Sequence, residues 1–145
     1  MKDKIVYIDM DDTICNFFNG VLNYKRKYPT ILYPQSIPGF FINLEPIEGA
    51  IDSVNLLTEK YDVYILTRPS VKNPLCYTEK RMWIEKHFGL EFCSKLIICP
   101  NKALLKGDYL IDDFIWAGFE GYQIVYKSSE FPNWLKVMEY FEKLN

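Results

Sequence analysis

The sequence lacks paired cysteine motifs, long apolar runs and an excess of charge of either sign. Its four cysteines show no C-x-x-C spacing and no secretory context, so we expect reduced thiols that fill the core of a cytoplasmic protein. No apolar run approaches the ~18 residues of a membrane-spanning helix, and we expect no signal peptide at the N-terminus. A net charge of −2 offers no positive surface for duplex nucleic acid or an anionic membrane. A small anionic ligand at a locally positive site stays compatible with all of these absences.

The composition of the sequence is typical of a globular protein, and its length suits one domain. Of its 145 residues, 49% are apolar, 25% charged and 17% aromatic, which argues against disorder. It has no internal repeat and no low-complexity segment. We therefore expect a single domain over residues 1–145. A homodimer is compatible with the sequence, although no repeated apolar stripe requires one.

Short apolar runs that suit buried strands alternate with segments of helical periodicity. We expect strands at residues 4–9, 62–67, 95–99, 108–112 and 122–126. We expect helices at residues 45–61, 75–89 and 133–144, with Pro46 in the first turn of the first one. This alternation predicts an α/β fold with a Rossmann-like, mostly parallel sheet flanked by helices. Residues 15–45, which hold three prolines and a weak helical pattern, are expected to form a small insertion after the first strand.

The stretch "VYIDMDDT" places three aspartates, Asp9, Asp11 and Asp12, directly after the first expected strand. Taken alone, this stretch could be a solvated turn. A second acidic pair, Asp112 and Asp113, follows the fourth expected strand, and the carboxyl ends of parallel strands meet at one edge of a sheet. Two acids from each strand end would then converge, which costs free energy unless a cation lies among them. Asp12 is expected to be a turn residue outside this group.

The donor atoms available at this edge are oxygens, because the single histidine, His87, lies elsewhere. Carboxylate oxygens favour Mg²⁺ over zinc or copper, and Mg²⁺ keeps coordination positions open for phosphate. Thr67 at the end of the second strand and Lys102 after the third would supply a hydroxyl and a positive charge for that phosphate. Lys106 and Lys80 are alternative sources of the charge.

This set of side chains suits phosphoryl transfer from a small phosphomonoester. Asp9 would attack phosphorus and form an aspartyl-phosphate, while Asp11 would protonate the leaving group and later deprotonate water. Thr67 and Lys102 would hold the phosphate oxygens, with Mg²⁺ offsetting charge. A non-catalytic nucleotide- or phosphate-binding module is the alternative from another class, and the intact pair Asp9 and Asp11 disfavours it.

Four motifs in this order resemble those of the haloacid dehalogenase-like (HAD) phosphatase superfamily: "DMDDT", "ILTRP", "NK" and "YLIDD". Within that superfamily the sequence is similar to the 5′(3′)-deoxyribonucleotidases. The similarity rests on "DMD" followed by Phe17, and on "PGFF", "LEP", "KRMW" and a lysine ten residues ahead of "IDD". The resemblance implies an HAD-type fold with a small cap at about 15–45, and Mg²⁺-dependent hydrolysis of nucleoside monophosphates, deoxyribonucleotides above all.

Carried over residue by residue, the resemblance implies Asp9 as the nucleophile and Asp11 as the acid and base. It implies a Mg²⁺ site made by the Asp9 side chain, the Asp11 backbone carbonyl and Asp113. Asp112 is left to orient Lys102 or a metal-bound water, and the division of roles within this acidic pair stays open. Three phenylalanines match positions where the family packs aromatic rings around the nucleobase and sugar: Phe17, Phe40 and Phe41.

Two positions depart from the family pattern and leave the substrate more open than the chemistry. Asp12 stands where the family usually has glycine, and Arg68 stands where it usually has a small residue. Arg68 is expected either to contact the phosphate or base or to obstruct them. A sugar phosphate as substrate, or phosphate transfer to an acceptor other than water, is therefore an alternative.

Overall fold

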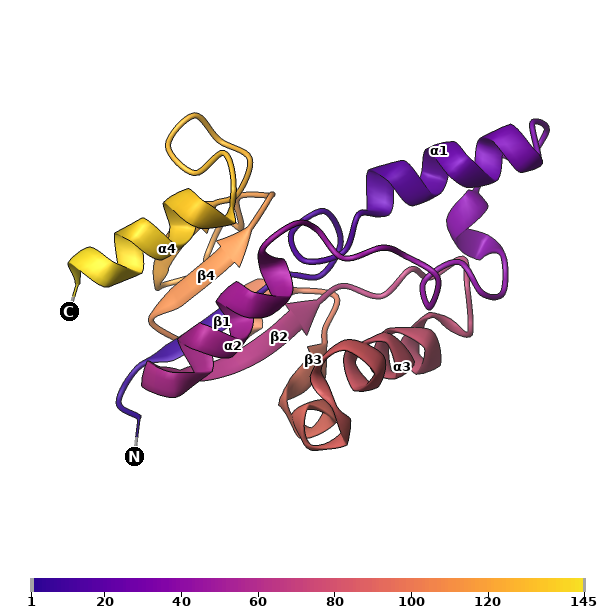
Figure 1. The fold of residues 1–145 in the computed structure, drawn as a ribbon. Helices are drawn as coiled ribbons and strands as arrows, with labels where there is room; N and C mark the ends of the chain where they lie inside the picture. The colour runs from indigo at the N-terminus through magenta and orange to yellow at the C-terminus, as the bar shows by residue number, and fades with distance from the viewer. Residues whose placement is uncertain (1, 145) are drawn as a thin grey trace.

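The computed structural model describes residues 2–144, which contain a five-stranded sheet. The strands are β1 (Ile5–Ile8), β2 (Asp62–Thr67), β3 (Leu96–Ile98), β4 (Tyr109–Asp112) and β5 (Tyr122–Val125). Their order is β3-β2-β1-β4-β5, and every neighbouring pair is parallel. The carboxyl ends of the strands therefore lie along one edge of the sheet, with β1 in the centre (Figure 1). The strand order reverses at β1, the place where ligands of open α/β sheets bind.

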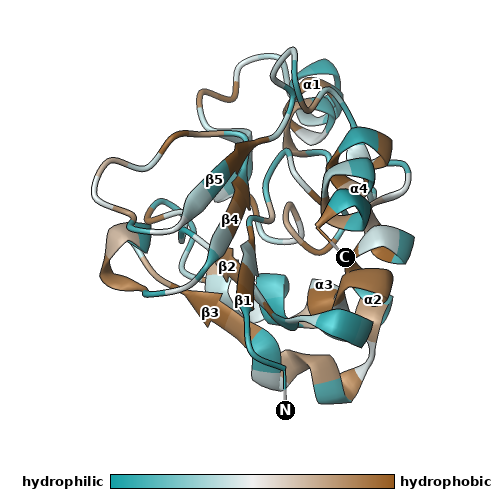
Figure 2. Ribbon diagram, turned by 90° about the vertical axis from the view of Figure 1, so that its left-hand side faces the viewer, coloured by the Kyte–Doolittle hydropathy of each residue, from teal (hydrophilic) through white to brown (hydrophobic). Residues whose placement is uncertain are grey.

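Three α-helices pack on one face of the sheet, as Figure 2 shows: α2 (Ala50–Lys60), α3 (Cys76–Phe88) and α4 (Trp134–Lys143). Their apolar side chains, such as Trp83 and Val137, form the main core with Ile8 and Ile65 of the central strands. A smaller apolar cluster around Tyr7 lies on the opposite face, under the segments before and after β4. The predicted α/β fold is confirmed, with these three helices on a single face. Within residues 2–144, none of the helices combines the length and apolar character needed to cross a membrane.

The expected strands agree with the observed ones to within one residue at either end. The prediction that Pro46 lies in the first turn of a helix was wrong. Helix α2 begins only at Ala50, after Gly49, whose φ of +77° suits a residue without a side chain. Pro46 instead forms an isolated antiparallel bridge with Cys15, and the next residue, Ile47, donates its N–H to the loop after β1. The chain has to rejoin that loop before it can turn into α2.

Residues 15–45, called the insert below, leave the sheet after β1 and return before α2. The insert contains α1 (Phe17–Lys27) and a short 3-10 helix, η1 (Pro34–Ser36). Figure 1 shows α1 extending beyond the carboxyl edge of the sheet. The insert is therefore placed next to the edge where the acidic residues gather.

Helix α3 holds the insert through the buried carboxylate of Glu79. This carboxylate accepts three backbone hydrogen bonds, from Gly39 at 3.0 Å, Phe41 at 3.1 Å and Ile42 at 3.3 Å. One turn further along the helix, the indole Nε1 of Trp83 donates to a backbone carbonyl oxygen of the insert at 2.7 Å. A buried carboxylate needs such donors, because leaving it without partners costs several kcal/mol, of the order estimated for buried ions in proteins. Glu79 thus makes the position of the insert depend on α3.

Candidate active site

The carboxyl edge of the sheet brings together side chains from four strand ends. Asp9 follows β1, Thr67 ends β2, Lys102 follows β3 and Asp112 ends β4, and all four are buried. A cavity of about 230 Å³ opens at this edge. Its described lining consists of five aspartates, two cations and two aromatic residues: Asp9, Asp11, Asp12, Asp112, Asp113, Arg68, Lys102, Phe114 and Trp116.

Both carboxylate oxygens of Asp9 accept hydrogen bonds. Lys102 Nζ lies 2.7 Å from Oδ1, and the Thr13 hydroxyl donates to Oδ2 at 3.1 Å. Burial raises the pKa of the Asp9 carboxyl above its ordinary value, while the Lys102 ammonium acts in the opposite direction. The two donors fix the orientation of this carboxylate against the cavity, an arrangement that suits a nucleophile.

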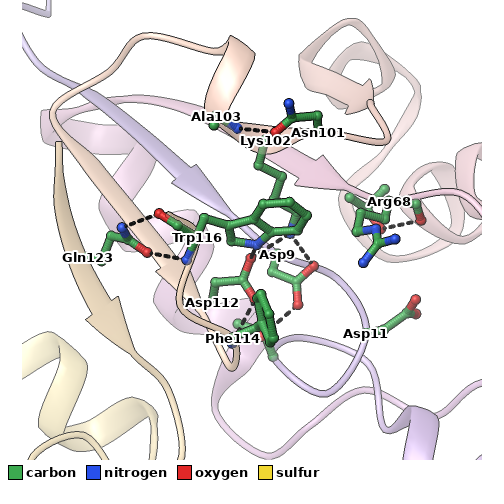
Figure 3. A network of polar contacts seen from close by, with 12 residues as sticks. Asp9, Asp11, Arg68, Asn101, Lys102, Ala103, Asp112, Phe114, Trp116 and Gln123 are labelled. Atoms are coloured by element: carbon green, nitrogen blue, oxygen red, sulfur yellow. Dashed lines mark hydrogen bonds and ion pairs between the residues drawn. The ribbon is translucent and has the colours of Figure 1, made fainter. Parts of the chain in front are cut away.

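Lys102 lies between two acids and holds them together. Its Nζ is 2.6 Å from Asp112 Oδ2, in addition to the contact with Asp9, and its side chain is almost fully buried. Asp112 also accepts hydrogen bonds from Trp116 Nε1 and from the Phe114 backbone N–H, both at 3.0 Å (Figure 3). Removing the Lys102 charge would leave both buried carboxylates without a counter-charge, so the position of each acid depends on this lysine.

Asp113 completes a group of three acids with Asp9 and Asp112, and one oxygen of each lies within 4.8 Å of the other two. Loss of surrounding water and the charge of Asp9 raise the pKa of Asp113 to about 8. A hard divalent cation would reverse this shift, because it attracts the ionised carboxylates. The oxygen donors therefore fit Mg²⁺, with the Asp113 carboxylate close to that of Asp9 while Lys102 engages Asp112.

Asp11 lies apart from the Asp9 and Asp112 pair in Figure 3 and contacts a residue of α3 instead. Lys80 Nζ is 3.0 Å from Asp11 Oδ2 and 2.7 Å from the Arg68 carbonyl oxygen, and it also donates to the Thr67 hydroxyl oxygen. Burial alone would lower the pKa of Lys80, but the Asp11 carboxylate outweighs it and the pKa is raised. A second buried ammonium group thus joins the residues at the strand ends.

From the sequence, Lys80 was a more distant alternative to Lys102 than Lys106 was. A signal for it was nevertheless present in the helical spacing. Lys80 is four residues from both Cys76 and Ile84, so the three share the buried face of α3. A lysine on the apolar face of a helix needs a buried partner, which was the clue to its place in the site. The other alternative, Lys106, precedes β4 and therefore lies toward the opposite edge of the sheet.

Asp12 lies in the turn after β1, as expected for a residue outside the acidic group. Its φ of +60° is in the left-handed region, where glycine is favoured and aspartate is tolerated. This explains why glycine suits the position. The Asp12 carboxylate accepts the Phe18 backbone N–H at 3.0 Å, which satisfies a free donor in the first turn of α1. The residue therefore joins the loop after β1 to the insert.

The three phenylalanines expected around a nucleobase belong to the core of the insert. Phe40 and Phe41 are 0% and 2% exposed, and Phe17 packs on both, with ring centres 5.3 and 6.1 Å away. None of the three is in the described lining of the cavity, so their contact with a base stays a prediction. Phe114 and Trp116 line it instead, and the sequence reasoning missed them. Their one signal was an apolar run directly after the acidic pair, outside any expected strand.

Comparison with known proteins identifies the family to which the chain belongs. Residues 29–132 match the family described as 5′ nucleotidase, deoxy (pyrimidine), cytosolic type C protein. A protein of Vibrio phage KVP40 that is named as a 5′(3′)-deoxyribonucleotidase is 34% identical over 97% of this chain and 86% of its own length. The human 5′(3′)-deoxyribonucleotidase, cytosolic type, is 32% identical over 74% of this chain and 69% of its own. Among solved structures, a haloacid dehalogenase-like hydrolase from Burkholderia xenovorans LB400 covers 78% of this chain and 73% of that chain, with a TM-score of 0.46 and 13% identity.

The family match includes the ends of β2, β3 and β4 and the whole of α3, and the phage relative extends the likeness over nearly the full chain. The resemblance to the 5′(3′)-deoxyribonucleotidases is thereby confirmed. The chain belongs to the 5′ nucleotidase, deoxy (pyrimidine), cytosolic type C family.

Proposed function

We propose that the chain is a Mg²⁺-dependent phosphomonoesterase that hydrolyses nucleoside monophosphates, deoxyribonucleotides above all, through an aspartyl-phosphate on Asp9. Family membership makes it a phosphoric monoester hydrolase of the nucleotidase type. One observation carries the finer proposal. The buried Asp9 carboxylate is oriented by Lys102 and Thr13 against a cavity lined by charged residues.

The reaction takes place in two balanced steps at Asp9 and Asp11. In the first, an Asp9 oxygen bonds to phosphorus as the bond to the leaving oxygen breaks, and Asp11 gives that oxygen a proton. In the second, water attacks the aspartyl-phosphate while Asp11 takes its proton, which releases inorganic phosphate and restores the carboxylate. Lys80 holds Asp11 at one oxygen, and the Cys15 thiol makes a weaker contact at the other, at 3.5 Å. These contacts position the Asp11 carboxylate, which still lines the cavity and can exchange a proton there.

Mg²⁺ is the cofactor that fits the oxygen donors. The Asp9 and Asp113 carboxylates and the Asp11 backbone carbonyl would hold it, beside Asp112 in its ion pair with Lys102. When bound, the ion offsets negative charge between the nucleophile and the phosphate.

The phosphate itself needs cations and donors that the acids cannot supply. Lys80 and Lys102 are the two buried ammonium groups at the strand ends, and Arg68 adds a guanidinium to the cavity wall. The Thr67 hydroxyl accepts from Lys80, and its own hydrogen makes only a long contact of 3.4 Å with a backbone carbonyl. That hydrogen is available for a phosphate oxygen.

The insert is proposed to act as a cap that limits water at the cavity and contacts the leaving group. Its attachment to α3 through Glu79 supports this, since the next residue, Lys80, contacts Asp11. A cytoplasmic location accords with four cysteines that form no disulfide.

The test is phosphate release from 5′- and 3′-monophosphates of ribo- and deoxyribonucleosides, with a sugar phosphate and an aryl phosphate beside them. Each is measured with Mg²⁺ and with EDTA. Mg²⁺-dependent release that favours deoxyribonucleotides is the expected result. Preference for the sugar phosphate over every nucleotide would overturn the substrate assignment and keep the chemistry. Nucleotide binding without release of phosphate over hours would contradict an enzymatic function and favour a non-catalytic binding module.

A further inference from the structure

Arg68 differs from the two lysines of the site in having no acidic partner. Lys102 Nζ lies within 2.7 Å of two carboxylates and Lys80 Nζ lies 3.0 Å from one, so both ammonium charges are already compensated. Within residues 2–144, the Arg68 guanidinium forms no ion pair with a carboxylate. Arg68 nevertheless lines the cavity and is exposed there, directly after β2. A cation that faces a cavity without a counter-charge is available to bind an anion.

Trp116 gives the Arg68 side chain a surface to lie on. The guanidinium carbon is 5.4 Å from the centre of the Trp116 ring, which is within the range of a cation–π contact. An aromatic ring attracts the positive charge but accepts none of the hydrogen bonds that a guanidinium makes in its own plane, so those N–H donors stay free. At the other end of the residue, the Arg68 carbonyl oxygen accepts from Lys80 Nζ at 2.7 Å, which holds the backbone.

The Trp116 ring is itself held in place. The Trp116 backbone N–H donates to Gln123 Oε1 and its carbonyl oxygen accepts from Gln123 Nε2, both at 2.8 Å. The indole Nε1 donates to Asp112, and Figure 3 shows the ring lying over Lys102, whose Nζ is 5.8 Å from the ring centre. A fixed ring limits the positions open to the Arg68 side chain, so less conformational entropy is lost when an anion binds.

The charge of the cavity explains why an unpaired guanidinium matters. The described lining holds five aspartates against two cations, Arg68 and Lys102, so a phosphate group that enters as a dianion meets repulsion. Lys102 is engaged by Asp9 and Asp112, which leaves Arg68 as the lining cation whose charge is free. A guanidinium can donate two parallel hydrogen bonds to the oxygens of one phosphate, which an ammonium cannot do.

We propose that Arg68 binds the non-bridging oxygens of the phosphate group, and that Trp116 is the positioning residue that holds the guanidinium there. This proposal rests on the proposed function and deepens it, because it decides among the phosphate contact, the base contact and the obstruction that the sequence leaves open for Arg68. A small residue is usual at this position in the family pattern, so the contact is a feature of this chain. It predicts that Arg68 acts on every phosphomonoester alike, whatever its leaving group.

The first measurement is the dissociation constant of inorganic phosphate, determined by titration calorimetry with Mg²⁺ present, which requires no turnover. Arg68→Ser is expected to raise this constant at least about tenfold, as loss of hydrogen bonds to a charged group does. Arg68→Lys keeps the charge but not the paired donors, so it should recover only part of the affinity. Arg26→Ser removes an exposed arginine in the last turn of α1. It matches the change in net charge and should leave the constant unchanged.

Trp116 is tested with two substitutions. Trp116→Leu removes the ring, whereas Trp116→Phe keeps a ring and loses only the indole N–H that binds Asp112. Trp116→Leu should raise the dissociation constant of phosphate about fivefold, of the order of one cation–π contact, and Trp116→Phe should recover most of that loss. In Arg68→Ser the further change Trp116→Leu should have less than about a twofold effect, because a positioning residue acts through the residue that it holds. An equal effect of Trp116→Leu with and without Arg68 would overturn the role of Trp116.

Turnover separates contact with the phosphate from contact with the leaving group. Arg68→Ser should lower kcat/KM by the same factor for thymidine 5′-monophosphate and for 1-naphthyl phosphate, because the two share only the phosphate. A loss confined to the nucleotide would overturn the phosphate contact, and so would an unchanged phosphate dissociation constant or an equal change in Arg26→Ser.

Failure of this proposal is distinct from failure of the proposed function. If the wild type binds phosphate through Arg68 but releases none from any phosphomonoester, the proposed function fails and the phosphate contact stands. If the wild type cleaves nucleotides while Arg68→Ser binds phosphate as tightly as the wild type does, the function stands and the contact fails. If the wild type does not bind inorganic phosphate at millimolar concentration, the proposed contact also falls.

Discussion

The sheet edge and the insert lie side by side but are held in different ways. At the sheet edge, charged side chains at strand ends contact one another directly, as Lys102 does with Asp9 and Asp112. In the insert, aromatic rings form a core and the backbone is tied to a helix 40 residues away by Glu79. The first region is positioned by the strands themselves, whereas the second depends on α3.

Two adjacent residues of α3 join these regions. Glu79 binds the backbone of the insert, and Lys80 binds Asp11 at the sheet edge. Movement of the insert relative to the sheet must therefore act on α3 or break one of these contacts. The difference between the regions leads to a ranking of substitutions. Changes at the sheet edge should affect the chemical step, and changes at the insert should affect stability and substrate binding.

The largest effect is expected for Asp9→Asn. An amide is not a nucleophile at phosphorus, so kcat should fall at least about a thousandfold, as loss of a nucleophile typically does. Circular dichroism should show a folded protein, because the amide oxygen can still accept from Lys102 and the Thr13 hydroxyl can turn to accept from the amide NH₂ group. Phosphate release above one thousandth of the wild-type rate would argue against Asp9 as the nucleophile.

Glu79→Gln should have an intermediate effect on the other region. The amide keeps one acceptor oxygen, but its NH₂ group would face a backbone N–H of the insert, such as that of Gly39. One unsatisfied buried donor costs about 1–3 kcal/mol of unfolding free energy, measurable by urea denaturation. Limited proteolysis should cut the insert faster, and KM should rise more than kcat falls. Glu85→Gln, an exposed change on the same helix, is the control, and an equal loss of stability there would contradict the role of Glu79.

The sheet edge and the insert also differ in how much of each can be predicted from the sequence alone. Each of Asp9, Thr67, Lys102 and the acidic pair 112–113 ends or follows a strand. The alternation of strands and helices was therefore enough to bring them to one edge. The packing of the insert could not be derived in this way. Nothing in the local pattern of residues 15–45 says that their donors meet Glu79, because that contact joins segments that are distant in the chain.

The same reason accounts for the misplaced start of α2 and for the missed aromatic residues at the cavity. The spacing of apolar residues from 45 onward is helical, yet the bridge between Pro46 and Cys15 overrides it. Trp116 lies in the loop after β4 and faces the cavity because Gln123 of β5 binds its backbone. Local pattern fixed neither position, since each depends on a partner brought near by the fold.

A smaller effect, on pH dependence, should arise from Asp113. Its pKa of about 8 in the folded chain exceeds the ordinary value, so the folded state binds this proton more firmly than the unfolded state does. Stability of the metal-free protein should therefore fall as the pH rises from about 4 to 8. Burial lowers the pKa of His87, which adds a trend of opposite sign below its ordinary value of 6.5. The useful window is thus pH 6.5–8.

The measurement is the urea midpoint of wild type and Asp113→Asn across that window in EDTA. The wild type should lose stability relative to the variant as the pH rises, because the amide does not titrate. Mg²⁺ should remove this difference in slope, since a cation favours the ionised carboxylate. Parallel profiles in EDTA would show that Asp113 is not held against ionisation by its acidic neighbours.

The smallest effect is expected for Asp12→Gly, at the junction of the two regions. Glycine relieves the left-handed φ of +60°, but the substitution removes the hydrogen bond to Phe18 N–H and a loose ion pair with Lys127 at 3.6 Å. These opposing changes should leave the unfolding free energy within about 1 kcal/mol of wild type. Asp12→Ala loses the same contacts and keeps a side chain at positive φ, so it should be less stable than Asp12→Gly by roughly 1 kcal/mol. Both should keep kcat within about twofold, in contrast to changes at Asp9 three residues earlier. A large loss of kcat in Asp12→Gly would move Asp12 from the junction into the reacting group, and the division between sheet edge and insert would have to be redrawn around it.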